Sequence, residues 1–106
     1  MPTLSRDADL QTVITTFEVS PATCQDLLDE LRESYDAFIR HQPGFVGAAV
    51  HVNDAQTRIA IYSQWQRRQD FQAMLRADEM RARMRRINGL CRTFEPVMYD
   101  VIDTYG

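Results

Sequence analysis

Lysine, long apolar runs and the common catalytic motifs are absent from this chain of 106 residues. The absence of apolar runs and of catalytic motifs each excludes a class of function. All 12 basic residues are arginine, and the net charge of −3 is too small to indicate a strongly acidic or basic partner. No apolar segment approaches the length that spans a membrane. The polar start of the chain shows no apolar signal-peptide segment, so we expect a cytoplasmic protein without a membrane partner.

Glycine and cysteine are also scarce. The four glycines are scattered and form no phosphate-binding loop, and neither G-x-S-x-G nor H-E-x-x-H occurs. Cys24 and Cys91 lie far apart and outside any metal-ligand spacing, so we expect free thiols in a reducing compartment. We therefore predict that the protein holds no metal, flavin or nicotinamide cofactor.

One short segment is strongly basic. Residues Arg81 to Arg86 read RARMRR, but no stacking aromatic residues lie beside them and the chain is acidic overall. This composition favours a solvated helix face, and we predict no nucleic-acid partner.

Two residue patterns alternate along the chain, one typical of strands and one of amphipathic helices. They predict strands at Thr12–Val19, Phe45–Val52, about Arg58–Trp65 and Arg92–Ile102, and helices from Ser20-Pro21 to Ile39 and from about Arg67 to Ile87. The second helix is expected to break at Arg76-Ala77-Asp78, with Asp78 as the new N-cap. The order is β-α-β-β-α-β, a ferredoxin-like α+β fold in a single domain, residues 1–106, with residues 1–10 as a loose lead-in.

The third predicted strand organises the rest of the fold. Alternation places Ile59, Ile61, Ser63 and Trp65 on one face and Arg58, Ala60, Tyr62 and Gln64 on the other. Both helices of this fold pack on one face of the sheet, so the face with Ala60 and Tyr62 would be bare in a monomer. An uncovered apolar face indicates an interface, and we predict a homodimer joined sheet to sheet.

A small-molecule pocket is predicted between the sheet and the helices. Its expected lining is Ile59, Ile61, Ser63, Trp65, Phe71, Met74, Met80 and Met84. The same stripe of methionine and phenylalanine also suits a closed core, and both interpretations stand. On the second strand, Gly47 and Ala49 leave space beside His51, which is equally consistent with a partly exposed structural histidine.

Three segments carry a resemblance to a known family. QPGFVGAAVH at 42–51, IYSQWQRRQDF at 61–71 and the dipeptide Ala77-Asp78 resemble the antibiotic biosynthesis monooxygenases. The resemblance implies a dimeric α+β barrel and a cofactor-independent monooxygenase that uses O₂ to oxidise an aromatic, anthrone-like polyketide. It identifies Trp65, Arg85 and His51 as catalytic candidates and places Ile61 and Phe71 at pocket positions. Together with Ser63, Met74 and Met84 of the predicted pocket lining, Ile61 and Phe71 are the substrate-binding candidates.

The family resemblance also supplies roles and departures. Trp65 would stack on the substrate, Arg85 would hold an enolate or phenolate oxygen, His51 would accept a proton and Ser63 would donate a hydrogen bond. Ile61 stands where the family has an asparagine, and Phe71 stands where it has a tyrosine. These two departures keep open the alternative of a non-catalytic small-molecule-binding or accessory dimeric protein.

Overall fold

The computed structural model describes residues 10–106 and shows the predicted order of elements. The expected lead-in, residues 1–10, lies outside the described residues except for Leu10. Four strands, three α-helices and one 3₁₀ helix follow in the order β1 (Gln11–Glu18), α1 (Pro21–Ala37), η1 (Ile39–His41), β2 (Phe45–Val52), β3 (Arg58–Trp65), α2 (Arg68–Arg76), α3 (Asp78–Asn88) and β4 (Thr93–Tyr99). No helix in this described part is long and apolar enough to cross a membrane.

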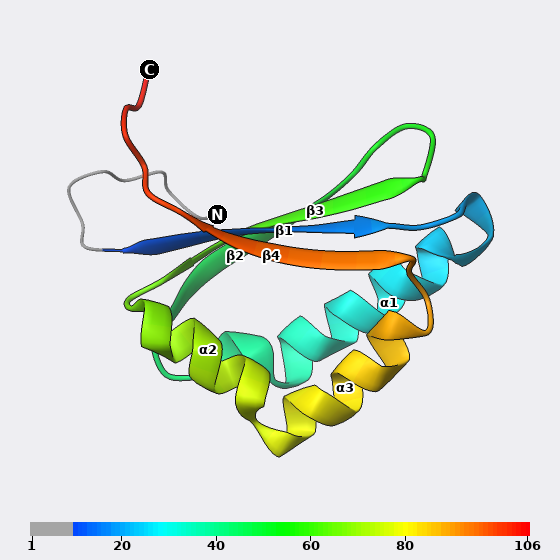
Figure 1. Cartoon of the computed structure of the whole chain (residues 1–106), viewed down its shortest axis with the longest axis horizontal. Coiled ribbons are helices and arrows are strands. Elements are labelled where there is room, and N and C mark those ends of the chain that lie inside the picture. Colours follow the sequence, from blue (N-terminus) through cyan, green and yellow to red (C-terminus); the bar gives the residue numbers. More distant parts are fainter. Residues whose placement is uncertain (1–9) are drawn as a thin grey trace.

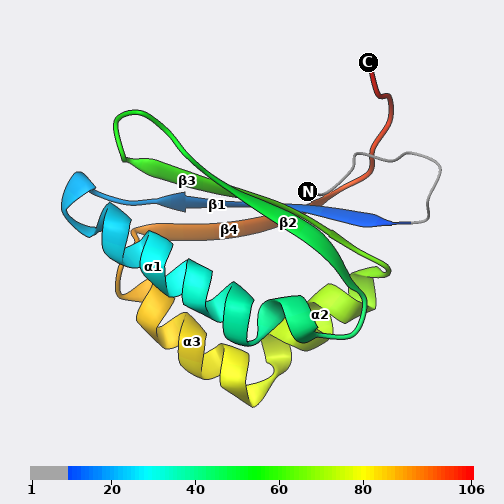
Figure 2. The same cartoon turned by 180° about the vertical axis from the view of Figure 1, so that it is seen from behind.

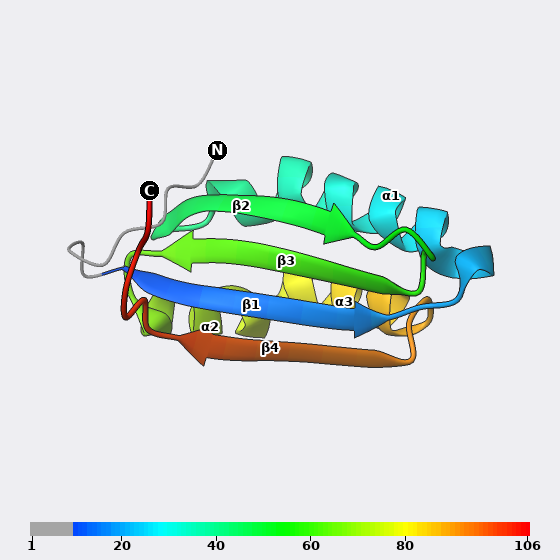
Figure 3. The same cartoon turned by 90° about the horizontal axis from the view of Figure 1, so that it is seen from above.

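The four strands form one antiparallel sheet in the order β2-β3-β1-β4. All the helices of residues 10–106 cover one face of this sheet, as Figure 1 and the reverse view in Figure 2 show. Figure 3 looks onto the opposite face, which none of these helices covers. This arrangement confirms the predicted ferredoxin-like α+β fold.

The fourth strand is shorter than predicted. It ends at Tyr99 instead of Ile102, because Tyr99 pairs with Thr12 and the neighbouring strand β1 begins at Gln11. Beyond Tyr99, no strand of the described chain supplies further hydrogen bonds. Pro96 lies within β4, which is an edge strand, and the edge position expected for this proline is confirmed.

The first helix begins as predicted and ends early. Ser20 is its N-cap residue and Pro21 its first helical residue, as the Ser-Pro pair indicates. Phe38 leaves the helical region with φ −135°, so α1 ends at Ala37, and Ile39 begins a 3₁₀ helix that runs to His41.

The predicted break in the second helix is confirmed. Ala77 is extended, with φ −62° and ψ 141°, and separates α2 from α3. The N-cap of α3 is this Ala77, so the prediction of Asp78 was wrong by one residue. Asp78 instead lies in the first turn, where its carboxylate interacts favourably with the positive end of the helix dipole.

Gly44 lies in the turn between η1 and β2, where a glycine is required. Its φ is +83°, and a Cβ at this position would collide with the side chain of Asp70 on α2. The carbonyl of Gly44 accepts a 2.7 Å hydrogen bond from the backbone N–H of Gln66. The turn therefore holds the start of β2 against the end of β3 and the start of α2.

The core lies between the sheet and the helices. Ile59, Ile61, Ser63 and Trp65 are all buried on the helix side of β3, as the alternation predicted. Trp65 packs edge to face between Phe45 and Phe71, with ring centroids 5.3 and 5.7 Å away. This aromatic row joins β2, β3 and α2.

Candidate functional site

A small cavity lies within the predicted pocket region, between the sheet and the helices. Its volume is about 30 Å³, the room needed by a single water molecule. Its walls are almost entirely apolar: Thr15, Phe17, Leu31, Tyr35, Ile39, Ile61, Phe71, Met74, Leu75, Met80, Met84, Ile87 and Phe94. Five of the predicted lining residues are among them, and we call this space the inner cavity.

Ser63 and Ile59 belong to the surrounding core instead of the cavity wall. Both are buried, and the Ser63 hydroxyl donates a 3.3 Å hydrogen bond to the backbone carbonyl of Val13 on β1. That bond already uses the one proton that Ser63 could offer a ligand.

Trp65 does not line the inner cavity but packs against a residue that does. Its side chain is fully buried, and the edge of its indole packs against Phe71, which does line the cavity. Its indole Nε1 is buried and has no hydrogen-bond partner among residues 10–106. A buried donor of this kind is uncommon and costly, so this N–H is a group that a ligand could satisfy.

Arg85 lies at a surface opening next to the cavity. It is exposed on α3 and lines a shallow hollow of about 390 Å³. Leu75, Met84 and Phe94 line both this hollow and the inner cavity, so a thin apolar wall separates the two. The guanidinium of Arg85 can therefore meet a ligand that enters between α2, α3 and β4.

His51 lies on the opposite face of the sheet. It pairs with Ala60, whereas its neighbours Val50 and Val52 pair with the inward-facing Ile61 and Ile59. The His51 Nδ1 lies 3.2 Å from the carbonyl oxygen of Ala60. The structure thus places Arg85 and Trp65 on the helix side of the sheet, close to residues that line the inner cavity, and His51 on the opposite face.

The basic segment of α3 departs from the sequence prediction at one residue. Arg81, Arg85 and Arg86 are exposed, as expected for a solvated face, but Arg83 is buried. The Arg83 guanidinium donates a 2.9 Å bond to Glu79 and a 3.4 Å bond to the Ser34 hydroxyl of α1. Sequence periodicity could have found it, since position 83 lies between Met80 and Ile87 on the buried side of the helix.

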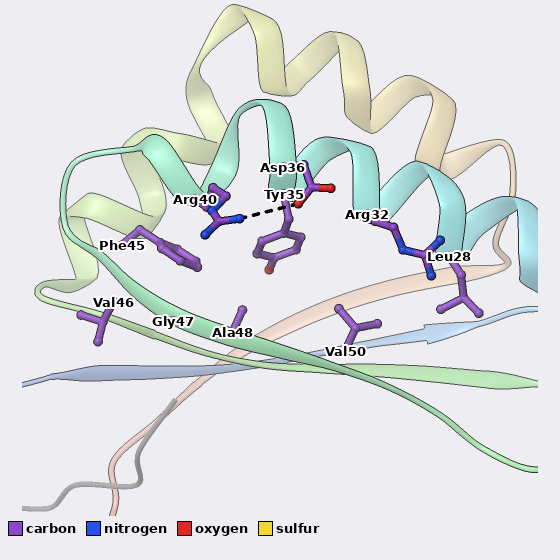
Figure 4. Close-up of a pocket in the computed structure, with 10 residues that line it drawn as sticks. All are labelled: Leu28, Arg32, Tyr35, Asp36, Arg40, Phe45, Val46, Gly47, Ala48 and Val50. Carbon is purple, nitrogen blue, oxygen red and sulfur yellow. Dashed lines mark ion pairs between the residues drawn. The ribbon is translucent and has the colours of Figure 1, made fainter. Parts of the chain in front are cut away.

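A larger groove between α1 and β2 was missed by sequence reasoning. Its volume is about 450 Å³, and its lining, drawn in Figure 4, is Leu28, Arg32, Tyr35, Asp36, Arg40, Phe45, Val46, Gly47, Ala48 and Val50. Burial raises the pKa of Tyr35 far above its usual value, so its phenol stays neutral at physiological pH. We call this space the α1–β2 groove; Tyr35 lines both it and the inner cavity.

A sequence comparison decides the family. A profile of the antibiotic biosynthesis monooxygenase family matches residues 10–86, the region that runs from β1 through most of α3 and contains most of the inner-cavity lining. The chain belongs to the antibiotic biosynthesis monooxygenase family.

Three proteins named as monooxygenases or oxygenases resemble the chain over nearly its whole length. The tetracenomycin-F1 monooxygenase of Streptomyces glaucescens is 30% identical over all 106 residues and 94% of its own length. The cofactor-independent oxygenase SnoaB of Streptomyces nogalater, in a mutant form, superposes with a TM-score of 0.79 at 21% identity, covering 92% of this chain and 97% of that one. A monooxygenase from ActVA-Orf6 of Streptomyces coelicolor, in complex with the ligand nanaomycin D, gives 0.75 at 25% identity over 90% and 89% of the two chains.

The two departures from the family pattern both fall on the inner cavity. Ile61 and Phe71 form part of its wall, so an amide and a phenol expected there are replaced by apolar surface. Within the described residues 10–106, no group of three or more His, Cys, Asp or Glu side chains could hold a metal ion. The candidate site of this monooxygenase-family chain is therefore an apolar cavity backed by Trp65, with Arg85 in the adjoining surface hollow.

Proposed function

We propose that this protein is a cofactor-independent monooxygenase that oxidises an anthrone-like aromatic polyketide with O₂ during antibiotic or other secondary-metabolite biosynthesis. The family match carries the monooxygenase assignment. The substrate class is supported by the tetracenomycin-F1 monooxygenase, which is similar over the full chain. The apolar walls of the inner cavity suit a polycyclic ring system.

The proposed reaction balances with O₂ as the oxidant. An anthrone CH₂ group loses a proton to give a resonance-stabilised carbanion, which transfers electrons to O₂. One oxygen atom becomes the new carbonyl oxygen, and the other leaves as water with the two hydrogens of the CH₂ group. The substrate supplies all four electrons, so the protein needs only to bind it, orient it and stabilise its anion.

Arg85 and Trp65 are the side chains to which we assign these tasks. Arg85, in the surface hollow next to the inner cavity, would hold the oxygen on which the negative charge develops. Trp65 would fix the orientation of the rings through Phe71 or directly, with its Nε1–H as a hydrogen-bond donor. His51 could accept the proton only from a ligand on the uncovered sheet face.

Substrate binding must enlarge the inner cavity. Its present volume of about 30 Å³ is far below the hundreds of Å³ that an aromatic polycycle needs. Met74, Met80 and Met84 form much of the helix-side wall, and unbranched methionine side chains repack at low cost. We therefore propose that the ligand enters by displacing Met84 and Leu75, which separate the cavity from the Arg85 hollow.

We also propose a homodimer joined through the uncovered sheet face. Ala60 and Tyr62 lie on this face, with Val97 and Tyr99 of β4 exposed beside them. Sedimentation equilibrium at micromolar concentration should give twice the 12.3 kDa chain mass, whereas a monomer would reject this interface.

Oxygen uptake with an anthrone, measured with and without protein and corrected for the spontaneous background, tests the enzymatic proposal. Arg85→Gln should lower kcat about 10- to 100-fold, because the charge matters most once the anion forms. Arg67→Gln, which removes an exposed arginine paired with Asp70, is the matched control and should keep the wild-type rate. A wild-type rate equal to the background across several polycyclic phenols would reject the enzyme.

The apolar residues at positions 61 and 71 favour one second candidate, a non-catalytic binding or accessory protein of the same fold. Without the amide and phenol, the cavity retains few groups that could polarise a substrate. This alternative predicts that an anthrone binds, that Arg85→Gln changes only its affinity, and that oxygen uptake stays at the background rate.

A further inference from the structure

The α1–β2 groove has the size and the shape to take a flat small molecule. Its volume of about 450 Å³ falls within the range of small-molecule sites, in contrast to the inner cavity. Figure 4 shows α1 above the groove and β2 below it, with the Tyr35 ring projecting from the helix toward the strand. Gly47 and Ala48 leave space on the β2 side of the groove, because neither carries a large side chain.

The ends and walls of the groove are apolar and aromatic. The rings of Tyr35 and Phe45 meet with centroids 6.1 Å apart and an interplanar angle of 58°, closing the groove toward the core. Leu28 and Val50 continue the apolar surface at the other end. A planar aromatic ring system could lie between these walls and contact the two rings.

The rim of the groove is cationic. Arg32 lies on α1, and Arg40 lies in the 3₁₀ helix η1 that follows it. Arg32 lies 3.5 Å from Asp29 and Arg40 lies 3.8 Å from Asp36, and more than half of each of these side chains is exposed. Such loose surface pairs hold a guanidinium weakly, which leaves both groups free to turn toward a ligand.

The groove lining contains one carboxylate, Asp36, which lies 3.8 Å from Arg40. Asp36 and Arg32 also line a second hollow on the outer side of α1, together with Asp29 and Glu33. The groove lining itself therefore holds two guanidinium groups, one carboxylate and the neutral phenol of Tyr35, a donor. This balance favours an anion.

We propose that the α1–β2 groove is a binding site for a planar aromatic anion, such as a polycyclic carboxylate or phenolate, separate from the inner cavity. The rings lie between Phe45, Tyr35 and Ala48, and the anionic group meets Arg32 or Arg40. The proposal rests on this groove alone and holds whether or not the protein oxidises an anthrone.

Calorimetric titration of the full-length protein with anthraquinone-2-carboxylate tests the site, and the uncharged anthraquinone-2-carboxamide is the control ligand. Arg32→Gln with Arg40→Gln should weaken carboxylate binding about tenfold or more, by loss of charge-assisted hydrogen bonds. The control variant Arg67→Gln with Arg92→Gln has the same net charge as the Arg32/Arg40 variant. It removes two exposed arginines outside the groove and should bind the carboxylate like the wild type. Higher salt should weaken binding to the wild type more than to the Arg32/Arg40 variant.

A second pair of variants locates the ligand. Ala48→Phe places a ring in the groove and should abolish binding, while Arg85→Gln, at the inner cavity, should leave it unchanged. The proposal is overturned if the carboxylate does not bind, if the carboxamide binds as tightly, or if Arg85→Gln weakens binding and the Arg32/Arg40 variant does not. The surface arginine variants keep the test decisive even if Ala48→Phe fails to fold.

Discussion

Replacing Trp65 with phenylalanine should change the free energy of unfolding by less than about 1 kcal/mol, although Trp65 is fully buried. Truncating a buried aromatic residue to alanine costs about 3–5 kcal/mol, and a phenylalanine ring would refill most of the space, leaving a loss of about 1–2 kcal/mol. The change also removes a buried indole N–H for which residues 10–106 supply no hydrogen-bond acceptor. Its removal stabilises the fold by about 1–3 kcal/mol. The two contributions nearly cancel.

Phe71→Leu is the matched control for this prediction. Phe71 is also buried and contacts the Trp65 ring at 5.7 Å, but it has no polar atom whose removal could offset the lost packing. It should cost about 1–2 kcal/mol. Urea unfolding followed by far-ultraviolet circular dichroism, at one fixed protein concentration, gives both values. A loss of more than about 3 kcal/mol for Trp65→Phe would show that the indole N–H has a partner, and would refute the reasoning.

Three further predictions concern stability and thiol chemistry. Gly44→Ala should destabilise the fold by about 2 kcal/mol or more, and Asp70→Ala in the same chain should recover part of that loss in urea unfolding, since it removes Cγ and Oδ2 of Asp70, which the new Cβ would meet, although the Asp70 Cβ remains. Arg83→Met should cost about 1–2 kcal/mol, because the buried Ser34 hydroxyl loses the guanidinium; a thermal melt unchanged from the wild type would contradict this. Burial raises the pKa of the Cys91 thiol, so its alkylation by iodoacetamide, followed by mass spectrometry, should accelerate only above the pH at which an exposed cysteine reacts.

The fold could be predicted from the sequence because its local patterns agree with its global arrangement. The alternation along β3 placed Ile59, Ile61, Ser63 and Trp65 correctly on the buried face. Errors occurred at element ends, where tertiary pairing decides. The fourth strand stops at Tyr99 because its neighbour β1 begins at Gln11, a limit that β4's own residues do not encode.

The candidate site could be predicted only in part. Residues on the buried stripes, such as Ile61 and Met74, line the inner cavity, since periodicity defines which face is inward. Periodicity does not reveal how well side chains fill the space, so it could not distinguish a substrate-sized pocket from the 30 Å³ cavity observed. The family resemblance grouped His51 with Trp65, although the pairing of β2 with β3 turns His51 to the other face.

The α1–β2 groove could not be predicted for a similar reason. Its walls come from a helix and an edge strand whose separation depends on the packing of Tyr35 against Phe45. The sequence shows small residues at Gly47 and Ala48, but it does not show that a helix passes over them.

The most direct test of the central claim is the fate of the two oxygen atoms of O₂. Wild-type protein free of added cofactor is incubated with an anthrone under ¹⁸O₂, and the product is followed by mass spectrometry against a protein-free control. The account predicts that the protein raises the rate at which product containing one ¹⁸O atom appears, while the second atom appears in water. Product formed at the protein-free rate, or a protein-dependent product whose new oxygen comes from solvent, would contradict it.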